Sequence, residues 1–236
     1  MSYAMMVKES VSNYSELEIV DAHKLYKEKF SNIPQEAFYK TFSRMAKSGE
    51  VKRVAKGIYC RPKKSRFGII VSDENNIIEY YLGPKNRSGV VVGYRMYNKY
   101  KLTTQISKSI EMYSNVTLQQ EKNIGNVKIF KANIEFDEPK TCLIELLEVL
   151  ENYKKIEDLN LRNLLQMIED SIQYYNNAIL DQLIKVIGYK KRTLASLKNV
   201  LDYYGIENTV NKYLNETSDY DALRMEIINE ITSWWK

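Results

Sequence analysis

The feature of this sequence that most restricts its fold is an amphipathic segment that begins at Pro34, ends at Gly49 and leads directly into a basic hairpin. Phe38, Phe42 and Met45 recur at three- and four-residue spacing, which predicts a helix with one apolar face. Proline suits the first turn of a helix, and glycine just after the last turn can take the left-handed conformation that ends one. The pattern therefore places one helix within narrow limits.

The residues on both sides of this helix predict the rest of one small module. Two strand-like runs follow it, Val51–Ala55 and Ile58–Arg61, and Lys56-Gly57 supplies the tight turn between them. Three elements are expected before it: a helix over Tyr3–Asn13, an extended piece over Leu17–Val20 and a helix from the N-cap Asp21 to about Phe30. Helix, helix, turn, helix and basic hairpin is the order of a winged helix-turn-helix, which is assigned to residues 1–66. The polar run from Pro62 to Arg66 is interpreted as the exit from the module.

The remaining chain predicts an α+β protein with two further regions. Residues 67–138 form a mixed α/β domain with a helix over Asp73–Leu82 and extended segments at Val90–Val92, Ile110–Leu118 and Asn126–Ile134. Residues 139–236 form a helical region packed on it. There, one apolar stripe keeps a 3.6-residue period from Leu161 to Leu183, and later helices are expected over Leu194–Tyr204, Ile206–Leu214 and from Ser218 or Asp219 to Trp234.

Charge is concentrated early in the chain. The net charge is +5, but ten cations stand between Lys40 and Arg66 against the single acid Glu50. Clustered cations replace the counterions of duplex DNA, so this placement on a helix and hairpin predicts DNA binding. The polar side of the third helix is expected to contact DNA in the major groove, through Gln35, Lys40, Thr41, Ser43, Arg44 and Lys47. The hairpin is expected to hold the backbone or enter the minor groove, through Lys52, Arg53, Lys56 and Arg61.

Several classes of function are not expected. The sequence lacks the common nucleotide-binding, nucleophile-elbow and zinc-protease motifs, so no catalysis and no cofactor is predicted. Its one histidine, His23, is interpreted as a surface residue, and Cys60 and Cys142 belong to no metal or redox motif. No apolar stretch is long enough for a membrane span and no secretion signal is found, so a cytoplasmic protein without membrane contact is expected.

Two segments resemble a known family. The run Ser43–Tyr59, SRMAKSGEVKRVAKGIY, resembles the third helix and wing of antitoxins of the abortive-infection AbiEi family. The run Val90–Gln105, VVVGYRMYNKYKLTTQ, is similar to that family's central helix and its L-T-T-Q segment. The resemblance covers about residues 1 to 150. Lys99, Tyr100 and Lys101 depart from it, because the family commonly has small or apolar residues there.

The resemblance implies two activities. The winged helix would bind the promoter of its own operon and repress it, and the C-terminal region would counteract a nucleotidyltransferase-like toxin without forming a stable complex with it. This would be the antitoxin of a type IV toxin–antitoxin system, a bacterial phage defence. Two other hypotheses stay open: a stand-alone transcription factor whose helical half senses a ligand, and an interaction module that neutralises a toxin by direct contact.

Overall fold

The computed structural model of this chain describes residues 2–215, 220–226, 228 and 230. It is an α+β protein, as the sequence predicts, and it divides into two compact units. The first comprises Met1–Tyr81 with Asn123–Val127, and the second comprises Leu82–Lys122 with Lys128–Lys236. No helix within the described part of the chain is long and apolar enough to cross a membrane.

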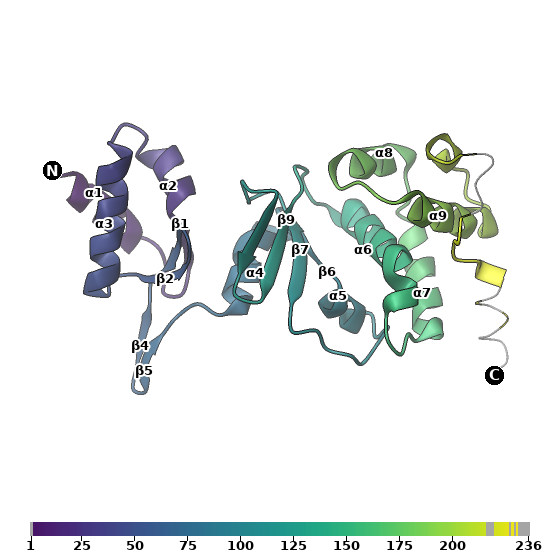
Figure 1. The fold of residues 1–236 in the computed structure, drawn as a ribbon, viewed down its shortest axis with the longest axis horizontal. Coiled ribbons are helices and arrows are strands. Elements are labelled where there is room, and N and C mark those ends of the chain that lie inside the picture. Colours follow the sequence, from purple (N-terminus) through teal and green to yellow (C-terminus); the bar gives the residue numbers. More distant parts are fainter. Residues whose placement is uncertain (1, 216–219, 227, 229, 231–236) are drawn as a thin grey trace. The chain divides into compact units, whose positions relative to one another are not determined.

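The first unit is built on three helices, α1 (Tyr3–Ser12), α2 (Ala22–Lys29) and α3 (Gln35–Ser48) (Figure 1). Both α1 and α2 pack against α3. The Asp21 side chain caps α2 by accepting hydrogen bonds from the backbone N–H groups of the first turn. A cluster of buried residues fills the space between the helices; it contains Val7, Val11, Leu25, Phe30, Phe38, Phe42 and Met45.

A three-stranded antiparallel sheet closes the same core, in the order β1-β3-β2. Strand β1 (Ile19–Asp21) and strand β2 (Lys52–Ala55) flank the central strand β3 (Ile58–Cys60). Gly57 has a φ of +76°, which the tight turn between β2 and β3 requires and which glycine takes without steric cost. The hairpin expected from the sequence is therefore present.

A second hairpin follows where the sequence analysis expected only an exit from the module. Strand β4 (Lys63–Ser65) pairs antiparallel with β5 (Gly68–Ile70), and α4 (Glu74–Leu82) comes next. The prediction for Pro62–Arg66 was wrong because every residue of both strands is exposed. Such strands lack the alternation of buried and exposed positions that identifies a strand in sequence.

The second unit contains most of a four-stranded sheet, in the order β6-β7-β9-β8. The strands are β6 (Gly89–Val92), β7 (Ile110–Ser114), β8 (Glu121–Ile124) and β9 (Val127–Lys131). The 3₁₀ turn η1 (Pro84–Asn86) precedes this sheet, and α5 (Tyr94–Lys99) lies between its first two strands. Strands β7 and β9 fall within extended segments predicted from the sequence, β6 begins one residue before the predicted Val90–Val92, and β8 was not predicted.

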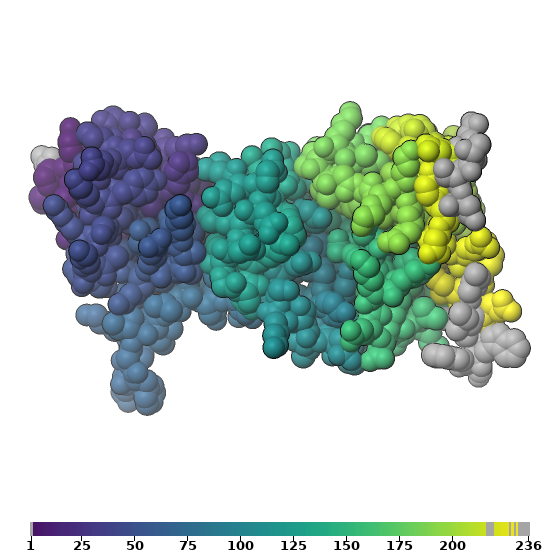
Figure 2. All heavy atoms as spheres, in the orientation of Figure 1, coloured from purple at the N-terminus to yellow at the C-terminus, as the bar shows by residue number. Residues whose placement is uncertain are grey.

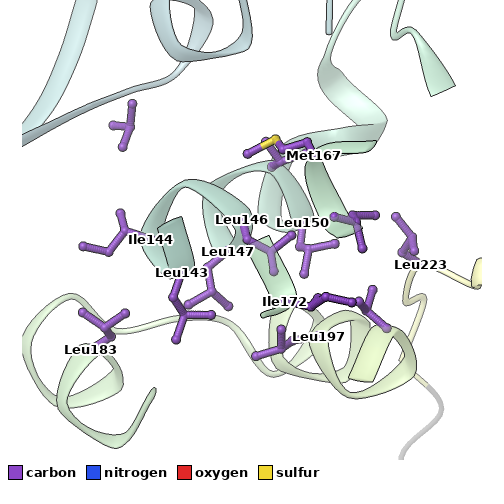
Figure 3. Close-up of a cluster of buried hydrophobic side chains, with 14 of the residues drawn as sticks. Leu143, Ile144, Leu146, Leu147, Leu150, Met167, Ile172, Leu183, Leu197 and Leu223 are labelled. Carbon is purple, nitrogen blue, oxygen red and sulfur yellow. The ribbon is translucent and has the colours of Figure 1, made fainter. Parts of the chain in front are cut away.

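The C-terminal half is helical, as expected. It contains α6 (Glu138–Asn152), η2 (Tyr153–Lys155), α7 (Leu161–Ile172), α8 (Asn177–Val186), α9 (Lys191–Tyr203) and η3 (Val210–Tyr213). Figure 3 shows the apolar cluster at its centre, where leucines of α6 meet residues of α7, α8 and α9. Asn176 caps α8, so the single stripe expected over Leu161–Leu183 is divided between two helices.

Two boundaries differ from the expectations. The predicted region 1–66 ends inside the second hairpin, whereas the first unit continues to Tyr81. The predicted border at residue 138 separates the sheet from α6, yet both belong to the second unit. Of the predicted helix over Ile206–Leu214 only the short η3 forms. Of the helix expected from Ser218 or Asp219 to Trp234, residues 220–224 are not helical, residues 225, 226, 228 and 230 are helical, and the others lie outside the described residues.

Candidate nucleic-acid interface

Helix α3 carries five of the ten predicted contact residues at exposed positions. Its buried positions are Phe38, Thr41, Phe42 and Met45, which leaves the opposite side of the helix free. Gln35, Lys40, Ser43, Arg44 and Lys47 are all exposed, as the sequence predicts. Gly49 ends the helix with a φ of +79°, so α3 keeps a defined length and Lys47 stays in its last turn.

The exposed residues occupy a narrow arc. At about 100° per residue, Ser43, Lys47, Lys40 and Arg44 fall in that order within an arc of about 100°. Gln35 lies about 80° outside this arc, in the first turn of the helix. Four of the predicted side chains can therefore face one surface together, and Gln35 reaches it only from the side.

A shallow depression lies along the N-terminal half of this face. Its lining consists of Gln35, Glu36, Tyr39, Lys40 and Ser43. Below it, the Tyr39 hydroxyl lies 3.3 Å from Nδ1 of His23 on α2. His23 is therefore half-buried beside Tyr39 and is not a free surface residue.

The cations of α3 differ in their freedom to contact a ligand. Lys40 Nζ lies 2.8 Å from Glu36 Oε1 one turn earlier, an ion pair between two largely exposed side chains. No acidic side chain of residues 2–215 is paired with Arg44 or Lys47. Arg44 and Lys47 are thus the charges most available on the helix.

Thr41 is a correction to the predicted interface. Only 5% of this residue is exposed, and its hydroxyl donates a hydrogen bond to the Ala37 carbonyl at 3.0 Å. A side chain in that position faces the core and cannot contact phosphate or base. The helical spacing already groups Thr41 with Phe38, Phe42 and Met45, so periodicity should have excluded it.

Arg61 is a second correction. Its guanidinium donates to the backbone carbonyls of Ser12 and Tyr14, the former at 2.8 Å. These bonds attach the end of the first sheet to the C-terminal end of α1. Arg61 is therefore committed to the structure of the first unit and is not free to grip DNA.

The hairpin β2–β3 presents its cations on more than one side. Lys56 is exposed in the turn, Arg53 is exposed on β2 with Nε donating to the Ala55 carbonyl at 3.3 Å, and Lys52 is half-buried. Neighbouring strand residues point to opposite faces, so Lys52 and Arg53 lie on opposite sides of the hairpin. Of the three, Lys56 is the one that lies in the turn, and it is exposed there.

The one acid of this region is neutralised locally. Glu50 accepts from Lys8 Nζ at 2.7 Å and from the Ser48 hydroxyl at 2.6 Å. These two hydrogen bonds, the one from Lys8 first, hold the pKa of the Glu50 carboxyl below its ordinary value. The acid is therefore already paired, and its ammonium partner comes from α1.

Sequence reasoning did not consider the second hairpin as a candidate contact surface. Lys63, Lys64 and Arg66 were counted in the basic cluster but not proposed as contacts, and Phe67 was not considered. All four are exposed on β4–β5 or its loop. A large apolar residue directly after the basic run Lys63–Arg66 was the available signal.

Comparison with known proteins adds little at the level of sequence. No protein-family model and no curated protein matches this chain. The crystal structure of the Rv2827c protein from Mycobacterium tuberculosis is similar over 85% of this chain and 76% of its own, with a TM-score of 0.41 and 9% identity. A functional assignment therefore depends on the residues of this chain itself.

Proposed function

We propose that the first unit is a winged helix-turn-helix that binds duplex DNA, with α3 as the recognition helix. The order α1-β1-α2-α3-β2-β3 and the sheet order β1-β3-β2 support this, because a winged helix combines three helices with such a sheet. The single observation that carries the proposal is the exposed arc of α3, in which Arg44 and Lys47 are unpaired among the described residues. Arginine and lysine are the side chains that read guanine in the major groove.

The charge outside α3 supplies affinity without much sequence preference. Lys56 at the turn of β2–β3 is exposed and can contact a phosphate, whereas Lys52 lies at the other end of β2 and is half-buried. Such contacts set position and salt dependence, whereas base contacts from α3 set specificity. We therefore expect substitutions of the α3 lysines to reduce sequence preference, and substitutions of the hairpin lysines to reduce affinity and its salt dependence.

We also propose that the protein represses its own operon and acts as an antitoxin, without catalysis. This part rests on the resemblance to AbiEi antitoxins. The first resembling segment forms the end of α3 and the hairpin β2–β3, and the second forms β6, α5 and a buried turn. Asn98 donates to the carbonyls of Thr103 and Gln105 at 2.8 and 3.0 Å, so the L-T-T-Q segment supports the fold of the second unit.

The departure at Lys99 and Tyr100 has a local explanation. Glu145 on α6 is only 3% exposed, and it accepts from Lys99 Nζ at 2.9 Å and from the Tyr100 hydroxyl at 2.5 Å. A buried carboxylate requires such partners. The polar residues at 99 and 100 are therefore matched by an acid on the facing helix.

A binding titration tests the DNA-binding proposal. The full chain is titrated against a labelled duplex from upstream of its own gene and against a shuffled duplex of the same composition. Lys47→Ala should reduce the ratio of the affinities for the upstream and the shuffled duplex by roughly 5- to 150-fold, as expected for the loss of one base contact. Lys185→Ala is the matched control, because Lys185 is also an exposed lysine in the last turn of a helix, α8. Equal affinity of the wild-type protein for both duplexes would refute specific binding.

Co-expression tests the antitoxin proposal separately. The product of the adjacent reading frame is expected to arrest growth alone, and this chain is expected to restore it. Lys47→Ala should still restore growth, because the resemblance assigns antitoxicity to the C-terminal region. Failure of the wild-type chain to restore growth would refute the antitoxin role, and stable co-purification of the two products would favour neutralisation by direct contact.

A further inference from the structure

The hairpin β4–β5 is an unusual surface feature of the first unit. Lys63 pairs with Ile70 and Lys64 with Ile69, so each face of the ribbon carries one cation beside one isoleucine. A two-residue loop, Arg66-Phe67, joins the strands. In Figure 1 the hairpin extends away from the three helices, and in Figure 2 it stands out as a separate projection.

The base of the hairpin is fixed to the body that carries α3. Leu17 N–H donates to the Arg61 carbonyl at 2.8 Å, just before β4. The Ser72 hydroxyl donates to the Leu17 carbonyl at 2.6 Å, just after β5. Both ends of the hairpin are therefore bonded to one residue, and the Arg61 guanidinium adds its bond to Ser12. Arg61 therefore helps to fix the base of the hairpin through both its carbonyl and its guanidinium.

The tip is also held in one shape. The Ser65 hydroxyl donates to the Gly68 carbonyl at 2.9 Å and accepts from the Phe67 N–H at 3.2 Å. The Phe67 side chain is 100% exposed, and Ile69 and Ile70 are 55% and 43% exposed. A preorganised loop thus presents an aromatic ring next to two exposed isoleucines, and an apolar patch with a polar rim is typical of an interaction site.

Charge indicates what that molecule is. From Val51 to Ser72 the chain has seven cations and no acid. Lys63, Lys64 and Arg66 are exposed, and no acidic side chain of the described residues pairs with them. An apolar wedge flanked by cations is the arrangement with which proteins enter the minor groove, unstack a base step and bind the adjacent phosphates.

We propose that the β4–β5 hairpin is a second DNA contact, whose tip enters the minor groove and inserts Phe67 between base pairs. Arg66 lies in the groove beside it, and Lys63 and Lys64 contact the flanking phosphates. The inference rests on the DNA binding proposed for α3 and deepens it. The protein would then bend its operator, so part of its preference would come from how easily a sequence deforms.

Bending measured by energy transfer tests this inference. A duplex from upstream of the gene carries a donor and an acceptor dye at its ends, and the full-length chain is added at saturating concentration. The wild-type protein should bring the ends closer, in the range of roughly 20–90° of bend that wedge-inserting proteins produce. Phe67→Ala should still bind and should lose most of this bend. Ile106→Ala is the matched control, because Ile106 is an 87% exposed apolar residue of the second unit.

The outcomes separate this inference from the proposal on which it rests. The insertion of Phe67 is refuted if the wild-type protein binds DNA without bending it, or if Phe67→Ala bends it as much as the wild-type protein does. Neither result contradicts recognition by α3. Absence of binding to any duplex overturns both. Sedimentation with phosphatidylglycerol vesicles that depends on Phe67, with no change in DNA bending, would assign the hairpin to a membrane surface and overturn the inference.

Discussion

Replacing Lys56 by alanine should reduce the salt dependence of DNA binding by the amount expected for one phosphate. Lys56 is exposed at the turn of β2–β3 and has no acidic partner in the described structure. Each phosphate neutralised on B-DNA adds about 0.9 to the slope of log affinity against log salt. Between about 50 and about 200 mM salt, the ratio of wild-type to Lys56→Ala affinity should therefore narrow about 3.5-fold.

Fluorescence anisotropy over a salt series measures this directly. The same loss of slope is expected on the upstream and the shuffled duplex, because a phosphate contact carries no sequence information. Lys185→Ala removes a comparable lysine from α8 and should leave the slope unchanged. A slope for Lys56→Ala equal to that of the wild-type protein would contradict the placement of the β2–β3 turn against the backbone.

Three further predictions concern the corrected residues and the second unit. Arg61→Ala should lower the free energy of unfolding by about 2 kcal/mol, since it removes charge-assisted hydrogen bonds to two carbonyls; a change below 0.5 kcal/mol in urea denaturation would contradict this. Thr41→Val should leave DNA affinity within about twofold of the wild-type value, because the hydroxyl bonds inside the helix; a larger loss in titration would restore Thr41 to the interface. Burial, and secondarily the Glu111 carboxylate, raises the pKa of the Glu148 carboxyl to about 7. The folded protein therefore holds this proton more tightly than the unfolded chain, and that stabilisation is lost as pH rises from about 4.5 to 7. Over this pH interval, the free energy of unfolding of Glu148→Gln should rise by up to roughly 3 kcal/mol relative to that of the wild-type protein. A difference between these two free energies that stays constant with pH in denaturation curves would argue against the raised pKa.

The parts of the first unit that could be predicted are those determined by local sequence. Helix α3 follows from the spacing of Phe38, Phe42 and Met45, and Gly49 marks its end. The turn at Gly57 likewise follows from the residue type that positive φ requires. These elements place the exposed arc of α3 without any knowledge of distant contacts.

The errors come from interactions between distant segments and from a missing sequence pattern. Arg61 bonds to Ser12 and Tyr14, far away in the chain, so its sequence neighbours could not reveal this role. The hairpin β4–β5 has no buried face, so periodicity does not identify it. The buried Glu145 on α6 accepts hydrogen bonds from Lys99 and Tyr100. These partners are distant in sequence, so the residues next to Glu145 do not reveal them.

Methylation interference on the upstream duplex shows whether α3 reads guanines, because a methyl group on guanine N7 blocks contact from the major groove. If the free cations of α3 read bases, methylation of particular guanines should abolish binding of the wild-type chain. Arg44→Ala or Lys47→Ala should then remove the interference at one of those guanines and leave the others unchanged. Full binding to DNA methylated at every guanine would contradict recognition by α3.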